Sequence, residues 1–354
     1  MRQTTDPPTW HRVVPLAAAV VACAIVAVGI DGHADLPATR FLPWLAMPLA
    51  VVWLAVSAWV WRHPGTPWTL ILAVSVLLRV LAAAEPPGLS SDIYRYAWDG
   101  HVSRSGVNPY AWPPDDVHVA ALADTRIQPA INRPAARTVY PPGAQTLFAV
   151  LPYDVDLVRA AMITAELFGL ILMVMLLGRL GQDPARVILW AWSPLAIYEV
   201  GNGGHLEAAL LPVLVGLALA LRAGHLRLAG GLAGWAVALK LYPLALVPAL
   251  VARLPRRRAA LIATAAALVV AVSYLVWGWS VGARVIGFLP QYVGVAEDHN
   301  IGMRRLIDGL VAVVAAGALD PVQARVAAFV ACGFIWLGVA IGLQRARPPL
   351  EVHM

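Results

Sequence analysis

Long uninterrupted apolar blocks are the feature that most constrains what this chain can fold into. Of its 354 residues, 60% are hydrophobic and 13% are charged, whereas a soluble globular protein has about 25% charged residues. Many of the blocks approach the roughly 20 residues that cross a bilayer. They predict membrane spans at 13–30, 41–61, 67–84, 157–179, 185–200, 207–222, 258–277 and 324–344. The expected fold class is therefore an all-α polytopic membrane protein.

The apolar stretch 228–252 is interrupted in its middle by Lys240, Tyr242 and Pro243. Arginines precede this stretch and follow it, which places both of its ends on one side of the membrane. Two short half-helices that meet near Lys240 would take the chain in and back again. Such breaks are tolerated at membrane depth where they line a cavity or are buried in protein.

Arginines in the short loops predict the orientation, because positive loops stay in the cytoplasm. They are Arg62, Arg179, Arg186, Arg222, Arg227 and the cluster from Arg253 to Arg258. Residues 31–40, 85–143, 200–206 and 278–303 then fall outside. With 303–318 as an outer interfacial segment, the chain has about ten passes and both termini inside; if 303–318 is a span, the C-terminus flips. We expect one domain over 1–354, with the long outer loop 85–143 containing short juxtamembrane helices.

The first turns of the outer loop hold a carboxylate at the membrane surface. Ser90 or Ser91 can cap a helix that begins here. Asp92, Arg95 and Asp99 share one face of this helix. A carboxylate beside a substrate hydroxyl can act as a general base, which makes Asp92 the candidate catalytic residue. An Arg95–Asp99 pair is equally the kind of ion pair, four residues apart, that commonly stabilises a helix.

Aromatic residues surround this carboxylate. Tyr94, Trp98 and His101 share a neighbouring face of the same helix, and aromatic faces suit sugar rings or lipid headgroups. The alternative is a juxtamembrane helix whose charges are solvated and whose aromatics lie in the interfacial belt.

Two turn-rich segments place further polar side chains near the membrane surface. The first, 106–110, contains Asn108 and Tyr110, and the second, 140–145, contains Tyr140 and Gln145. Taken alone, they indicate only an ordered loop.

Two other segments carry charge at unusual positions. In the outer turn 199–207, Glu199, His205 and Glu207 could ligate a divalent metal or bind sugar hydroxyls, or simply flank a Gly-rich turn. Lys240 is the only lysine of the chain and lies within an apolar stretch. A buried cation of this kind suggests function, with phosphate as its natural partner, although a lysine that reaches the interface is the alternative.

Glu166 lies in the middle of a predicted span and needs a partner, for which Arg79 and Lys240 are candidates. In the last outer loop, Glu297-Asp298-His299-Asn300 followed by Arg304 and Arg305 could close over an anionic group. The charge of +6 is dispersed over loops, so no nucleic-acid partner is expected.

The string Asp92-Ile93-Tyr94-Arg95-Tyr96-Ala97-Trp98-Asp99-Gly100, with Gly106-x-Asn108-Pro109-Tyr110 and Tyr140-Pro141-Pro142, resembles bacterial GT-C glycosyltransferases. The most similar are polyprenol-phosphate-mannose-dependent mannosyltransferases grouped around glycosyltransferase family 87. The segments 204–207 and 240–243 are also similar to theirs, and the resemblance covers about residues 67–310. It implies a GT-C-like bundle with a catalytic carboxylate in the first outer loop, which is Asp92 here. It implies a basic residue near the lipid phosphate, Lys240 or Arg304. The last loop reads His299-Asn300-Ile301-Gly302 instead of an Asn-Gln-Ser-like string.

The expected function is an inverting transfer of a hexose, with mannose implied by the resemblance. No nucleotide-binding or hydrolase motif is present, and nucleotide sugars are cytoplasmic, so an outward site needs a lipid-linked donor. The polyprenyl-phosphate-sugar donor, a lipid or polysaccharide acceptor and membrane lipids are the expected partners, in a bacterial inner membrane with the site facing the periplasm or exterior. No cofactor is required, and a divalent metal is left open. The predicted substrate-binding residues are Tyr94, Arg95, Trp98, Asp99, Asn108, Tyr110, Tyr140, Gln145, Glu199, His205, Glu207, Lys240, Tyr242, His299, Asn300 and Arg304.

Two alternatives from other classes are open. A transporter or lipid-linked sugar flippase would use Lys240 and Glu166 as a coupled intramembrane pair. A non-catalytic membrane scaffold would respond to changes at Asp92, Lys240 or His205 only through stability.

Overall fold

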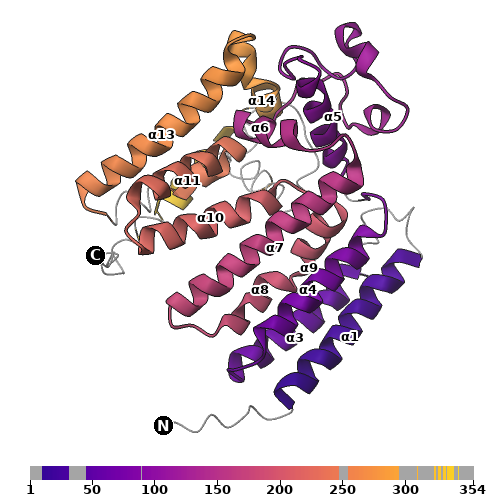
Figure 1. Ribbon diagram of the computed structural model, residues 1–354, viewed down its shortest axis with the longest axis vertical. Coiled ribbons are helices and arrows are strands. Elements are labelled where there is room, and N and C mark those ends of the chain that lie inside the picture. The colour runs from indigo at the N-terminus through magenta and orange to yellow at the C-terminus, as the bar shows by residue number, and fades with distance from the viewer. Residues whose placement is uncertain are drawn as a thin grey trace.

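The computed structural model describes residues 10–31, 45–88, 90–246 and 254–294, with isolated helical residues between 309 and 342. Helices and connecting turns make up these residues, and no strand occurs among them. The long helices are α1 (Trp10–Asp31), α3 (Met47–Arg62), α4 (Trp68–Ala83), α7 (Val155–Arg179), α10 (Glu207–Arg222), α11 (Leu226–Leu239) and α13 (Arg256–Gly278). They run roughly side by side (Figure 1).

The helices α5 (Asp92–Arg104) and α6 (Pro142–Val150) lie together at one end of this array (Figure 1). That end is called the outer end below, because it carries the predicted outer loop. The shorter elements are η2 (Val117–Leu122), η3 (Gln128–Ala130), η4 (Pro184–Val187), α8 (Ile188–Ala191), α9 (Pro194–Ala196), η5 (Ile197–Asn202), η6 (Tyr242–Leu246), η7 (Gly282–Ile286) and α14 (Leu289–Gly294).

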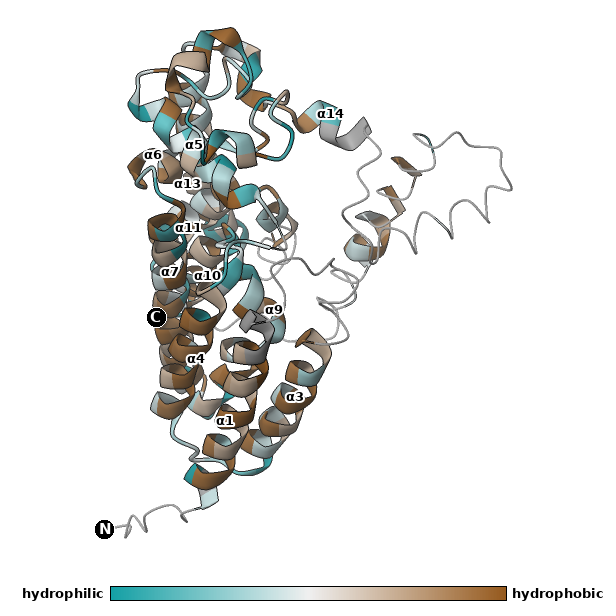
Figure 2. Ribbon diagram, turned by 90° about the vertical axis from the view of Figure 1, so that its right-hand side faces the viewer, coloured by the Kyte–Doolittle hydropathy of each residue, from teal (hydrophilic) through white to brown (hydrophobic). Residues whose placement is uncertain are grey.

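Two helices, α7 and α13, are long and apolar enough to cross a membrane, and shorter apolar helices cover 12–27, 47–62, 68–83 and 226–239. Large apolar side chains point outward from these helices, and Val51, Val80, Phe168 and Leu268 are each more than half exposed. Figure 2 shows the apolar colouring concentrated on the helical array. So much exposed apolar surface is unfavourable in water, and the fold is consistent with a helical membrane protein. The ten passes stay a prediction, since most of 324–344 lies outside the described residues.

Most predicted spans correspond to one helix, but the span predicted at 185–200 does not. The chain there forms η4, α8, α9 and the π-helix η5 in succession. Pro194 lacks an N–H and disfavours helical backbone in the residue before it. Ser193 accordingly adopts φ −58° and ψ 126°, which ends α8. The predicted span is therefore built from short helical pieces instead of one continuous helix, and the segment reaches the outer end as a π-helix followed by a turn.

Loops predicted to share the cytoplasmic side do meet at the end opposite α5. The Gly65 N–H donates to the Asp183 carboxylate at 2.9 Å, which joins the α3–α4 and α7–η4 turns. Arg222 donates to the Arg179 carbonyl at 3.2 Å, which joins the ends of α10 and α7. We call this the inner end.

Close approach of α11 to α13 depends on two glycines. A Cβ on Gly230 would lie 2.7 Å from the Ile262 carbonyl oxygen, and one on Gly234 would lie 2.5 Å from that of Ala266. The contact advances four residues along α13, from Ile262 to Ala266, as it advances four residues along α11, from Gly230 to Gly234. The two helices are therefore parallel, and both begin at the inner end. The starts of α11 and α13 thus lie at the same end of the array, as predicted for the two flanks of 228–252.

The predicted helix break is also confirmed. α11 ends at Leu239, Lys240 is extended with φ −147° and ψ 147°, and η6 follows from Tyr242.

A buried ion pair joins α4 to α7. Arg79 Nε lies 2.6 Å from Glu166 Oε2, and Arg79 Nη2 lies 2.9 Å from Oε1, with both side chains fully buried. Trp190 Nε1 donates to Glu166 Oε1 at 2.8 Å. Arg79 is therefore the partner of Glu166, and the Lys240–Glu166 pair that a transporter would use is not formed. Buried charges persist only when paired and hydrogen-bonded in this way.

The outer loop is packed onto the helices rather than standing apart. Ile93 and Tyr96 of α5 and Phe148 of α6 form one apolar cluster with Met162 of α7 and Leu239 of α11. A second cluster of buried residues fills the space among α1, α3, α4 and α7. The shared outer cluster fixes the position of α5 relative to the ends of α10 and α11, while the single domain over 1–354 stays a prediction.

Candidate active site

Asp92 is the first residue of α5 and lies at the outer end of the array. The Ser90 hydroxyl accepts the Asp92 N–H at 3.2 Å, while Ser91 at the N-cap position makes no side-chain cap bond. Asp92 Oδ1 accepts a hydrogen bond from Asn132 Nδ2 at 2.9 Å. The Tyr140 hydroxyl lies beside the same carboxylate; burial, Tyr96 and Asp92 together raise the pKa of Tyr140 well above its usual value. The carboxylate is thus oriented by neutral donors and stays partly exposed.

A glycine turn brings His205 to the first turn of α5. Gly204 has φ +59°, and a Cβ there would lie 2.5 Å from Ile93 Cδ1, so a side chain at this position would strain the backbone and displace the end of the Ile93 side chain. The contact places His205 near Asp92. The same turn places His205 beside Glu199 of η5, and Glu199 Oε2 lies 3.0 Å from His205 Nδ1.

The charge state of His205 follows from this setting. Burial alone lowers its pKa, but the hydrogen bond and charge of Glu199, with the charges of Asp92 and Glu207, raise the pKa above its usual value. The Nε2 atom is buried and has no hydrogen-bond partner in the described structure. A protonated ring would therefore offer an unused N–H donor inside the site.

Lys240 at the end of α11 forms an ion pair with Glu207 at the start of α10. The side chains are 26% and 38% exposed, respectively, so the expectation of a buried intramembrane cation was wrong. The physical reason is position: α11 runs outward and stops just before Lys240, which leaves the ammonium group at the outer end. Tyr242 follows in η6 and is more than half exposed.

Six predicted site residues therefore meet at the outer end, although they come from distant parts of the sequence. They are Asp92, Tyr140, Glu199, His205, Glu207 and Lys240. The arrangement combines a carboxylate general base with an ammonium group and a histidine, which suits proton removal from one oxygen and charge stabilisation on another.

Three other predicted residues form a buried network inside the outer loop. Arg95 Nε donates to Asp99 Oδ1 at 2.8 Å, and Gln145 Nε2 donates to Asp99 Oδ2 and to the Thr138 hydroxyl, both at 2.8 Å. Arg95 also donates to the Ala136 carbonyl at 3.0 Å. All of these side chains are buried. The Arg95 and Asp99 charges pair with each other and support the loop, while Arg95 Nη2 and Gln145 Oε1 are buried without a hydrogen-bond partner in the described structure.

Asn108, Tyr110 and Trp98 also have partners within the protein. Asn108 Nδ2 donates to the Trp277 carbonyl at 2.7 Å, which ties the loop to the end of α13. The Tyr110 hydroxyl donates to the Tyr140 carbonyl at 2.6 Å. Trp98 is only 2% exposed, so its ring is covered by protein rather than open to a substrate.

Tyr94 lines a separate cavity of about 580 Å³ beside the first turn of α5. Two residues after Asp92, it lies on nearly the opposite side of the helix. Its neighbours in the lining include Glu85, Asp124, Tyr153 and Arg159.

Sequence reasoning did not single out Asn132 or Asn202. Asn132 donates to Asp92 across 40 residues of irregular loop, and no spacing could have indicated it. Asn202 accepts the Gly88 N–H at 3.0 Å and donates to the Pro86 carbonyl at 3.0 Å, which anchors the chain entering α5. In the sequence, the position of Asn202 within the Gly-rich turn 199–207 was the signal that could have indicated this role.

No group of three or more His, Cys, Asp or Glu side chains suited to a metal ion occurs in the described part of the chain. Glu199, His205 and Glu207, which were considered for a metal, divide instead into two separate ion pairs. His299, Asn300 and Arg304 lie outside the described residues.

Residues 138–354 match the model of a family described as glycosyltransferase family 87. The match includes Tyr140, the 199–207 turn and Lys240, and it begins after Asp92. No curated protein and no solved structure matches the chain.

Proposed function

The chain belongs to glycosyltransferase family 87, and from this premise we propose that it transfers a hexose, mannose first among candidates, from a polyprenyl-phosphate donor to a lipid or polysaccharide acceptor. The family makes the protein a glycosyltransferase. The donor, the sugar, the acceptor and the inverting course of the reaction are the proposal.

The observation that carries the proposal is the meeting of Asp92 with the Glu199–His205 and Glu207–Lys240 pairs at one end of the helices. Asp92 removes the proton of an acceptor hydroxyl while that oxygen forms a bond to the anomeric carbon. The bond between the anomeric carbon and the phosphate oxygen breaks, and the polyprenyl phosphate leaves with the electron pair. Attack from the opposite face inverts the anomeric configuration.

Lys240 offsets the negative charge that develops on the departing phosphate. Glu207 holds the ammonium group in place, and its partial exposure leaves it accessible to an anionic ligand. Arg95, considered for the same role, is already neutralised by Asp99 in a buried pair. Arg304 is the proposed second cation.

The buried residues of the outer loop act by position rather than by touching substrate. We assign this role to Arg95, Asp99, Gln145, Asn108 and Tyr110, whose hydrogen bonds hold the loop against α6 and α13. Trp98 contributes packing.

The reacting hydroxyl of the acceptor lies at Asp92, and we propose that a more distant sugar unit of the same glycan occupies the separate cavity beside Tyr94, on the other side of α5. Its volume of about 580 Å³ falls in the range of small-molecule sites. Tyrosine rings and carboxylates in its lining suit a neutral sugar, which stacks on aromatic faces and donates hydroxyl hydrogen bonds.

Location follows from chemistry and orientation. The site lies at the outer end, and arginines of the α7–η4 and α10–α11 turns lie at the inner end, so the positive-inside rule supports the proposal that the site faces away from the cytoplasm. A donor available there is carried by a membrane lipid. A bacterial inner membrane with the site facing the periplasm or exterior fits these requirements.

The test is the substitution Asp92→Asn, with Asp115→Asn as the matched control. Asp115 is an exposed carboxylate in the same loop, so both variants lose one negative charge. A general base contributes about 10²–10⁴-fold, so Asp92→Asn should lower kcat by this factor, while Asp115→Asn retains the wild-type rate. Near-normal transfer by a folded Asp92→Asn protein would overturn the assignment.

A further inference from the structure

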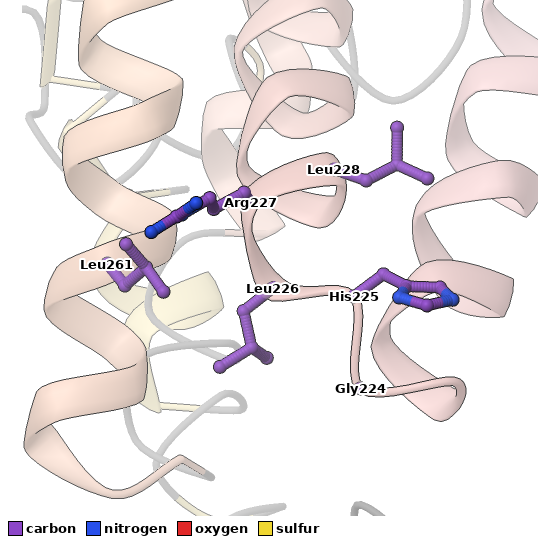
Figure 3. A pocket seen from close by; sticks show the side chains of 6 residues that line it. All are labelled: Gly224, His225, Leu226, Arg227, Leu228 and Leu261. Atoms are coloured by element: carbon purple, nitrogen blue, oxygen red, sulfur yellow. The ribbon is translucent and has the colours of Figure 1, made fainter.

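A second pocket lies at the inner end, far from Asp92. Its volume is about 610 Å³, and its lining is formed by Gly224, His225, Leu226, Arg227, Leu228 and Leu261. We call these six residues the inner pocket. It lies between the α10–α11 turn and α13, and in Figure 3 Arg227 and Leu226 extend toward Leu261 while His225 and Leu228 point away from it. Because α10 separates it from Glu207 by 16 residues, or about 24 Å of helix, the pocket is distinct from the proposed active site.

The surroundings of the inner pocket are strongly basic. Arg227, Arg256 and Arg257 are exposed, and Arg258 is partly exposed. None of them forms an ion pair with a described residue. No acidic residue occurs in 222–228 or in 254–265. Arg227 in the pocket lining and the three arginines in the first turn of α13 therefore have no acidic partner among the described residues.

The positions of these arginines are also unfavourable without an anion. α11 begins at Leu226 and α13 at Arg256, and neither helix has a side-chain cap. A helix N-terminus carries about half a positive charge and favours anions, so arginines in the first turn oppose it. The positive-inside rule requires basic residues somewhere in an inner loop but not within the first turns of two helices. An anion at the pocket would compensate the arginines and both helix ends together.

An apolar stripe continues from the pocket along α13. Leu261, Leu268, Val272 and Leu275 recur at helical spacing on one face and are 39–66% exposed. Arg257 precedes Leu261 by four residues and so shares this face. The surface thus offers a basic end followed by an apolar track, which is the polarity of a phospholipid.

We propose that the inner pocket binds the headgroup of an anionic phospholipid of the cytoplasmic leaflet, with an acyl chain along the stripe of α13. Basic pockets between transmembrane helices on the cytoplasmic side recognise such headgroups. The site is independent of the transfer reaction and does not require its donor. The apolar stripe selects a lipid over a soluble phosphate ester of the same charge.

Binding of a fluorescent phosphatidylglycerol to the purified full-length protein in uncharged detergent tests the proposal. We expect Arg227→Gln and Arg257→Gln each to weaken binding about fivefold, which corresponds to about 1 kcal/mol for each basic residue near an anionic lipid. Arg62→Gln is the matched control, because it removes an exposed arginine of the inner end that lies on α3, outside the pocket. It should leave binding unchanged.

Three results would overturn the proposal. One is equal weakening by Arg62→Gln and Arg227→Gln, which would indicate attraction by net charge alone. Another is equal binding of phosphatidylglycerol and phosphatidylcholine. The third is displacement of the fluorescent lipid by glycerol phosphate at the same concentration at which unlabelled phosphatidylglycerol displaces it. That result would indicate a site for soluble anions. Since the measurement uses binding and not transfer, its failure leaves the proposed enzymatic function separately testable.

Discussion

His205 lies close to three carboxylates. Glu199 holds its Nδ1, and the charges of Asp92 and Glu207 act on the same ring. The ring is thereby favoured in its protonated form, with Nε2 buried and unpaired in the described structure. In the proposed reaction such an N–H is placed to bind an oxygen of the donor or acceptor.

The charge on His205 predicts how stability depends on pH. An exposed histidine has a pKa of about 6.5, and the folded-state pKa of His205 is raised above it. The resulting stabilisation is complete below the unfolded pKa and is lost as the pH rises through the folded pKa. The difference in Tm between wild type and Glu199→Gln should therefore be largest near pH 5.5 and shrink toward about pH 9. Thermal unfolding across this range measures it.

Glu85→Gln is the control for this pH series, since it removes a partly exposed outer carboxylate that is not paired with His205. Its Tm difference from wild type should not follow the same curve. A Glu199→Gln difference that stays constant over the pH range would contradict the pairing.

Residue types were predictable at the site, but their partners were not. Asp92 and His205 stood out as polar residues at the edges of apolar blocks, and Lys240 as the one lysine within an apolar stretch. Asn132 as the donor to Asp92, and Glu207 as the partner of Lys240, depend on contacts between distant segments. The Arg95–Asp99 pair was the exception, because four-residue spacing on a helix is visible in the sequence.

Helices were predictable where composition alone decides them. α7 and α10 follow their apolar blocks almost residue for residue, because an apolar helix satisfies its own backbone in a membrane. In the segment 185–200 the apolar composition concealed the break that Pro194 makes in the helix. The π-helix η5 could not be predicted from composition, and within it Gly201 packs closely against Arg79 and Ala82 of α4, a contact between distant segments.

The α11–α13 contact supplies a prediction about elements. Gly234→Ala places a Cβ 2.5 Å from a backbone oxygen of Ala266, so the helices must separate. Overpacking of this kind costs about 1–3 kcal/mol. Gly231→Ala is the matched control, because a Cβ there meets nothing within 4 Å, and alanine favours helix by up to about 1 kcal/mol. Unfolding by SDS in mixed micelles measures both variants; equal destabilisation would refute the packing argument.

At the scale of the whole molecule, the two ends of the helical array carry opposite chemistry. The outer end gathers carboxylates, a histidine and a lysine over α5, and the inner end gathers arginines around the α10–α11 turn. Because α10 and α11 each run between the ends, the proposed transfer site and the proposed lipid pocket belong to the same two helices. The apolar surface between them fits a membrane that separates the two environments.

The central claim is that this glycosyltransferase takes its sugar from a membrane lipid, and donor dependence tests it most directly. The wild-type protein, reconstituted in liposomes, is supplied with polyprenyl-phosphate-mannose or with a nucleotide-linked mannose, and the product is followed by mass and anomeric configuration. We predict transfer from the lipid donor alone, with inversion at the anomeric carbon. Transfer from the nucleotide-linked donor at a comparable rate, or retention of configuration, would contradict the account.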